Sequence, residues 1–126
     1  MLIRQRRKIE TSTPEQFVKW LLSKTQDVAI ADVYEGASCP VRRFIEETVK
    51  VEVFVGVDEI AEHFVDHGHP TKTVRTPYWI QKFILALHNW ADERSHAKCR
   101  SERSLSMTVT PAEVREVLIG AELIPR

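Results

Sequence analysis

The sequence predicts a single α+β domain, in which about five helices surround a small sheet of two or three strands. Two observations carry this prediction: Thr-Pro pairs that are typical of helix starts, and one run of alternating valines that is typical of a strand. A chain of 126 residues is long enough to form one domain around its own core. We expect residues 13–126 to form this domain, and residues 1–12 to be a basic N-terminal arm that is either flexible or a strand.

Five segments carry the signals of helices. The sequences "TPEQ" at 13–16 and "TPAE" at 110–113 each place a threonine before a proline and a glutamine or glutamate at the third helical position. This arrangement is a capping box, which marks a helix start. "SCP" at 38–40 predicts the start of a shorter helix, and "TPYW" at 76–79 the start of the longest one. The remaining helix is expected to begin after Asp58, with Ile60, Ala61 and Phe64 on its buried face, and to end at Gly68.

Two segments are expected to be strands. "VKVEVFVG" at 49–56 alternates valines with mostly polar residues, and "VAIADVY" at 28–34 does so less regularly. Because a helix of suitable length lies between them, the sequence favours a β-α-β unit, although antiparallel pairing stays open. "LSMTVT" at 105–110 is expected to add an edge strand.

The composition argues against a disulfide-stabilised, a membrane-spanning and a secreted protein. The chain has only two cysteines, and no run of about 18 apolar residues that would cross a membrane. Its first residues, "MLIRQRRKIE", lack the apolar core of a signal peptide. The sequence therefore predicts a cytoplasmic protein that needs neither a disulfide framework nor a membrane.

The charges are balanced in total but uneven along the chain. Lysine and arginine together number 18, as do aspartate and glutamate. Residues 44–69 carry seven acidic residues against Lys50, a net charge of −6, whereas residues 70–106 carry +4. This pattern suits contact with a charged protein partner or with a second copy of the chain, so a homodimer stays open. The alternative is that folding mixes these segments into an even surface.

A partner-binding surface is expected around Tyr78 and Trp79, two aromatic residues beside the basic loop "HPTKTVR" at 69–75. The alternative role for this pair is to fix the start of the long helix to the sheet. Glu59, Glu62 and Asp66 are the other candidate contacts, because they lie in the acidic block.

Nucleic-acid binding is the main alternative function. Residues 57–87 can be aligned with a helix-turn-helix, although their connection is long and the first helix is acidic. Basic residues in two segments would then hold the phosphate backbone: Arg4, Arg6, Arg7, Lys8, Arg94, Lys98, Arg100 and Arg103.

A zinc-stabilised domain is the second alternative. "HFVDHGHP" at 63–70 places His63 and His67 four residues apart, and "HAKC" at 96–99 would add His96 and Cys99. No Cys-x-x-Cys pair and no His-Glu-x-x-His motif accompanies them. We therefore expect no metal or other cofactor, and the histidines are interpreted as the exposed end of a helix.

Catalysis has little support. The chain has four glycines and no phosphate-binding loop, and Cys39 has no base at a spacing that would activate it. The stretch "SCPVRRFIEE" at 38–47 resembles a Cys-Pro helix start, followed by an apolar residue and an arginine, in small uncharacterised bacterial and phage proteins. This resemblance implies a similar small α+β unit and no activity.

The sequence thus favours a small non-catalytic binding protein, which would serve as a regulator, adaptor or inhibitor. One hypothesis is that a phage or mobile element encodes it against a host machine.

Overall fold

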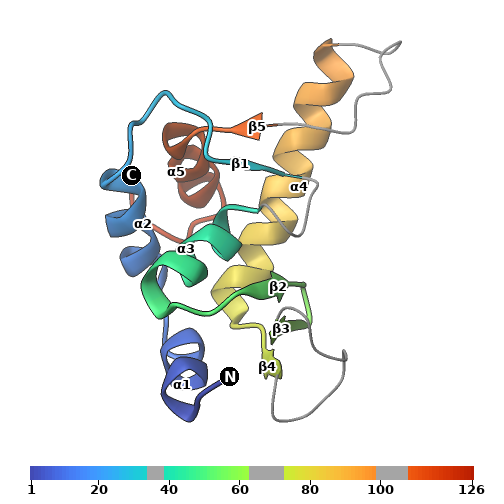
Figure 1. Cartoon of the computed structure of the whole chain (residues 1–126). Helices are drawn as coiled ribbons and strands as arrows, with labels where there is room; N and C mark the ends of the chain where they lie inside the picture. The colour runs from blue at the N-terminus through green and yellow to red at the C-terminus, as the bar shows by residue number, and fades with distance from the viewer. Residues whose placement is uncertain (34–38, 63–72, 99–107) are drawn as a thin grey trace.

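The computed structural model describes residues 1–33, 39–62, 73–98 and 108–126, with the main chain only for residues 95–98. It is a single α+β domain, as predicted (Figure 1). The described helices are α1 (Ile3–Glu10), α2 (Pro14–Leu22), α3 (Pro40–Val49), α4 (Tyr78–Lys98) and α5 (Pro111–Gly120). The described strands are β1 (Ala31–Asp32), β2 (Val53–Val55), β3 (Glu59–Glu62), β4 (Thr73–Arg75) and β5 (Thr108–Val109).

The predicted helix starts are confirmed by their hydrogen bonds. At the start of α2 the Thr13 hydroxyl accepts from the Gln16 N–H at 3.2 Å, and the Gln16 side chain accepts from the Thr13 N–H at 3.1 Å. Thr110 and Glu113 make the same pair of bonds at the start of α5, at 3.3 and 3.0 Å. These bonds satisfy backbone donors that the first turn of a helix leaves free.

The strands form two separate antiparallel sheets. β2, β3 and β4 make one in that order, and β1 pairs with β5 in the other. Figure 1 shows the β1–β5 pair in the upper half of the domain and the β2–β4 sheet in the lower half. The expected β-α-β unit is therefore wrong, because α3 connects strands that belong to different sheets. The valine run also begins later as a strand than predicted: Val49 ends α3, and Lys50 adopts a left-handed conformation with φ 66° that stops the helix.

The helix predicted after Asp58 is also wrong, because its first described residues form β3. Val53 pairs with Glu62 and Val55 with Ile60 across a tight turn, in which the Gly56 N–H donates to the Glu59 carbonyl at 3.0 Å. Ile60 and Ala61 are both buried although they point to opposite faces of the strand. A central strand that is covered on both faces gives a short continuous apolar run, which is also compatible with a helix.

The N-terminal segment is neither a flexible arm nor a strand, since residues 3–10 form α1. Ile9 of this helix is completely buried, and α1 packs on α3 and β4. The Gln5 side chain accepts from the Leu2 N–H at 2.9 Å and donates to the Lys50 carbonyl at 3.3 Å. A helix that buries a single large apolar residue leaves almost no periodic signal in a basic sequence.

An aromatic cluster joins the helices at the centre of the domain. The ring of Phe17 lies 5.2 to 5.9 Å from four neighbouring rings: Trp20, Phe44, Trp79 and Phe83. These side chains come from α2, α3 and α4, so the cluster connects three helices. Aromatic rings at such separations attract one another in addition to the area that they bury.

No helix in the described part of the chain is both long and apolar enough to span a membrane.

Candidate interaction site

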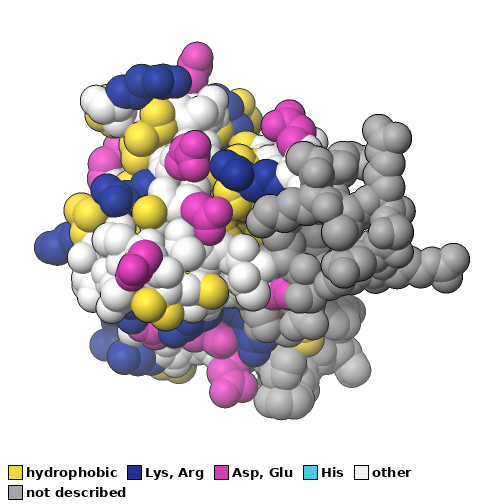
Figure 2. All heavy atoms as spheres, turned by 90° about the horizontal axis from the view of Figure 1, so that it is seen from above, with side chains coloured by type: hydrophobic (Ala, Val, Ile, Leu, Met, Phe, Trp, Pro, Cys, Tyr) yellow, Lys and Arg dark blue, Asp and Glu magenta, His cyan; other side chains and the backbone are white. Residues whose placement is uncertain are grey.

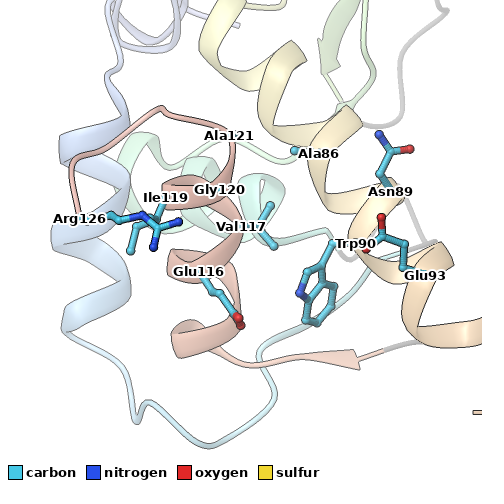
Figure 3. A pocket seen from close by; sticks show the side chains of 10 residues that line it. All are labelled: Ala86, Asn89, Trp90, Glu93, Glu116, Val117, Ile119, Gly120, Ala121 and Arg126. Carbon is cyan, nitrogen blue, oxygen red and sulfur yellow. The ribbon is translucent and has the colours of Figure 1, made fainter. Parts of the chain in front are cut away.

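A groove of about 730 Å³ lies between α4 and α5, which also pack against each other (Figure 3). Residues of α4 form one side: Ala86, Asn89, Trp90 and Glu93. The other side is formed by α5 and the chain that follows it: Glu116, Val117, Ile119, Gly120, Ala121 and Arg126. The groove is open at Gly120, where an added Cβ would meet no atom within 4 Å. Several small residues thus leave room for a side chain from another molecule.

Trp90 lies between the two helices and forms a wall of this groove (Figure 3). The Arg94 guanidinium lies 4.2 Å from the centre of the indole ring, and its Nη2 atom lies 3.7 Å from a carboxylate oxygen of Glu116. The indole N–H has no hydrogen-bond partner among the described residues. An unsatisfied buried donor costs free energy.

An exposed stripe on the outer face of α4 lies beside the groove, with the apolar residues Tyr78 and Leu85 and, between them, the polar residues Gln81 and Lys82. Tyr78 is 74% exposed and Leu85 is 55% exposed. The two residues are seven positions apart and therefore share one face of the helix. Asn89, which lines the groove, is four residues beyond Leu85 on the same face. The stripe and the groove together make the candidate interaction site.

The two aromatic residues expected to form a partner contact, Tyr78 and Trp79, differ in exposure. The Trp79 side chain is buried, and its indole N–H donates to the Ser12 carbonyl at 2.9 Å. It therefore fixes the start of α4 to the segment between α1 and α2, close to the alternative role expected for it, although the anchor is not the sheet. Tyr78 points outward and stays available as a contact residue.

Three of the seven carboxylates in the acidic block form ion pairs within the described part of the molecule. Glu46 pairs with Arg42 at 2.9 Å, Glu47 with Lys24 and Arg43, and Glu62 with the N-terminal ammonium group. Glu59 is exposed and faces Arg75 on β4, while Asp66 lies outside the described residues. On the face drawn in Figure 2, acidic and basic side chains are interspersed. These pairs favour the expectation of an even surface over that of one acidic patch.

Glu47 is the most connected of these carboxylates. Its Oε1 atom accepts from Lys24 Nζ at 2.5 Å and from the Trp20 indole N–H at 3.3 Å. Partial burial alone would raise the pKa of Glu47, but the hydrogen bonds from Lys24 and Trp20 and the charges of Lys24 and Arg43 outweigh it, so the pKa lies below its ordinary value.

A folded-state pKa that is below the unfolded one stabilises the fold above the unfolded pKa, and this contribution is lost as the pH falls through the folded pKa. We expect Glu47→Gln to lower the free energy of unfolding by about 1 kcal/mol or less at neutral pH, since the pair is partly exposed. The difference should vanish between about pH 5 and pH 3, as measured by urea denaturation across that range. Glu52→Gln, at an exposed carboxylate of the same block, is the matched control and should change little. A difference between Glu47→Gln and wild type that persists at pH 3 would contradict the ionic origin of the effect.

The helix-turn-helix alternative is wrong, because β3 replaces the beginning of its first helix. The basic residues proposed for this alternative do not gather in one described patch. Arg4, Arg7 and Lys8 are exposed on α1, whereas Arg94 is engaged by Trp90 and Glu116. Arg6 is only partly exposed on α1. Arg100 and Arg103 lie outside the described residues, as does the side chain of Lys98.

The candidate zinc ligands lie almost entirely outside the described part of the chain. This holds for His63, His67, Cys99 and the side chain of His96. Within the described residues, no three histidine, cysteine, aspartate or glutamate side chains gather as a metal site would require. Cys39 caps the start of α3: its sulfur accepts from the Arg42 N–H at 3.4 Å, and burial raises the pKa of its thiol. A neutral buried thiol is a poor nucleophile.

Leu85 and the groove residues of α5 were not expected from the sequence. The sequence did contain one signal for Leu85. Ile80, Phe83 and Leu87 mark the buried face of this helix, and Leu85 lies outside that face, where an apolar residue is exposed. Comparisons of the chain with models of protein families, with curated proteins and with solved structures find no match.

Proposed function

We propose that this chain is a non-catalytic binding protein that holds another protein through the outer face of α4 and the groove between α4 and α5. The observation that carries the proposal is the exposed stripe with Tyr78 and Leu85, which are 74% and 55% exposed beside a groove of about 730 Å³. Exposed apolar surface next to a groove with a tryptophan wall is typical of protein interfaces. A regulator, adaptor or inhibitor would act through such a surface.

The occupant that fits best is an amphipathic helix of the partner. Ala86, Gly120 and Ala121 line the groove with small side chains, which allow a third helix to come close to α4 and α5. Helices that bind in grooves do so through apolar side chains spaced three and four residues apart. One such side chain would rest on Gly120.

Charge complementarity favours a partner helix with at least one lysine or arginine. Glu93 and Glu116 stand on the two sides of the groove, which Arg126 also lines, and the Glu116 side chain is 64% exposed. Its ion pair with Arg94, at 3.7 Å, is long and partly exposed, so a basic group of the partner would compete for this carboxylate at little cost. These contacts would set the orientation of the partner more than its affinity.

The test is selection of helical peptides from a displayed library against the wild-type protein. We expect the selected peptides to combine spaced apolar residues with a lysine or arginine, and to bind Leu85→Arg about tenfold or more weakly, because the new charge stands on the exposed stripe. Gly120→Phe, which fills the groove without removing a contact, should weaken the binding of these peptides similarly. The measurement is the dissociation constant by fluorescence anisotropy.

Leu22→Arg is the matched control, because Leu22 is an equally exposed leucine, at 56%, on the outer face of α2. The affinity of the Leu22→Arg variant for the peptides should equal that of wild type. Peptides that bind Leu85→Arg and Gly120→Phe as tightly as wild type would refute the proposed site. Self-association of the wild type in sedimentation equilibrium, lost in Leu85→Arg, would instead identify a second copy as the occupant.

A further inference from the structure

A second hollow, of about 340 Å³, lies between α1, α2 and α3, away from the groove of the candidate interaction site. Four apolar side chains from α1 and α3 form its floor: Ile9, Phe44, Ile45 and Val49. The first three of these belong to the hydrophobic core, so the floor is held rigidly by the fold. Its volume is within the range of small-molecule sites, which also have apolar floors and a few polar groups.

The charged groups at this hollow are of one sign. Lys8 on α1 and Lys19 on α2 stand at its rim, and none of its lining residues is acidic. Both lysines are exposed, and neither forms an ion pair within the described part of the chain. Two unpaired ammonium groups above an apolar floor favour a ligand with an anionic head and an apolar body.

The hydroxyl groups at the rim restrict the ligand further. Thr11 donates to the Arg7 carbonyl at 2.7 Å, Ser12 to the Ile9 carbonyl at 2.7 Å and Thr48 to the Phe44 carbonyl at 2.6 Å. A hydroxyl has one proton to donate, so these three oxygens are left as acceptors. In this arrangement they do not donate to an anion, which leaves the lysines as its cationic donors.

From this arrangement we propose that the hollow between α1, α2 and α3 binds a small organic carboxylate with an apolar body. The carboxylate lies between Lys8 and Lys19, and the apolar body lies on the floor of the hollow, where Val49 is the partly exposed side chain. The proposal is independent of the protein-binding function, since the hollow and the groove share no residue.

The experiment is a titration of the full chain with octanoate and, separately, with naphthoate, followed by ¹⁵N–¹H correlation spectra. Saturable shifts at the amides of Ile9, Thr11, Phe44 and Thr48 are the expected result. The aliphatic and the aromatic acid distinguish a lipid-like from an aromatic ligand, and saturation by either supports the site. Octanol has the same chain length without the charge and should bind about fivefold more weakly or worse, as expected when two exposed charge contacts are lost.

Lys8→Gln combined with Lys19→Gln should weaken the binding of the carboxylate by about fivefold or more and leave the binding of octanol unchanged. Lys82→Gln, at a lysine on α4 that does not line the hollow, is the matched control and should leave both affinities unchanged. Shifts centred on the α4–α5 groove, equal affinities for octanoate and octanol, or no saturation by either acid would each overturn the proposal.

Discussion

Phe17→Ala is expected to lower the free energy of unfolding by about 4 kcal/mol, the largest effect of any substitution considered. The Phe17 side chain is completely buried and its ring lies within 6 Å of the rings of Trp20, Phe44, Trp79 and Phe83. Removing the ring loses its transfer from water and leaves a cavity that three helices together cannot close. Urea denaturation followed by tryptophan fluorescence measures the loss, since Trp20 and Trp79 both report on the cluster.

Phe54→Ala is the matched control for this substitution. Phe54 is only partly buried on β2, with the Arg42 guanidinium 5.9 Å from its ring centre, and its truncation should cost about 1–2 kcal/mol. If Phe17→Ala has no cooperative transition at all, Phe17→Leu can be measured in its place. This variant is expected to lose about 1.5 kcal/mol of unfolding free energy. A loss at Phe17→Ala no larger than at Phe54→Ala would contradict its central place in the core.

Ile9→Ala is expected to cost about 3 kcal/mol, although residue 9 belongs to a segment that the sequence presents as a basic arm. Its side chain is completely buried beneath α1, where this helix packs on α3 and β4. A truncation in a flexible arm would have no such effect, so the measurement distinguishes the two interpretations of this segment. The same denaturation experiment provides the free energy of unfolding.

Ile3→Ala supplies a control of identical chemistry on the same helix. Ile3 is 78% exposed, and its truncation should change stability by no more than about 0.5 kcal/mol. Equal effects of the two substitutions would mean that α1 does not dock as described.

Helix starts were predictable from the sequence because their chemistry is local. Thr13 with Gln16, and Thr110 with Glu113, satisfy the backbone of their own first turn, so four consecutive residues contain the whole signal. The boundary of β3 was not predictable in this way. Whether Ile60 and Ala61 lie in a helix or a strand depends on β2 and β4, which cover their main chain from both sides.

The candidate interaction site also has one part with a local sequence signal and one part that depends on distant segments. Tyr78 and Trp79 were both predicted as partner contacts, with fixing the start of the long helix as the alternative; Tyr78 is exposed, whereas Trp79 is buried. The groove, by contrast, requires α4 and α5 to lie side by side, and the spacing of residues within either helix does not predict this packing. The charge of the block at 44–69 was misleading for a similar reason: Lys24 and the N-terminus, which neutralise Glu47 and Glu62, come from far earlier in the chain.

The pairing of β1 with β5 has a consequence for the order in which the domain is made. Ala31 finds its strand partner in Val109, and the core needs Val114 and Leu118 of α5 to cover α2. While a ribosome is still adding α4, β1 has no strand to pair with, and the part of the apolar side of α2 that α5 covers is bare. The domain therefore closes late in synthesis, and until then its nascent chain carries an exposed edge and an exposed apolar helix face that invite association with other chains.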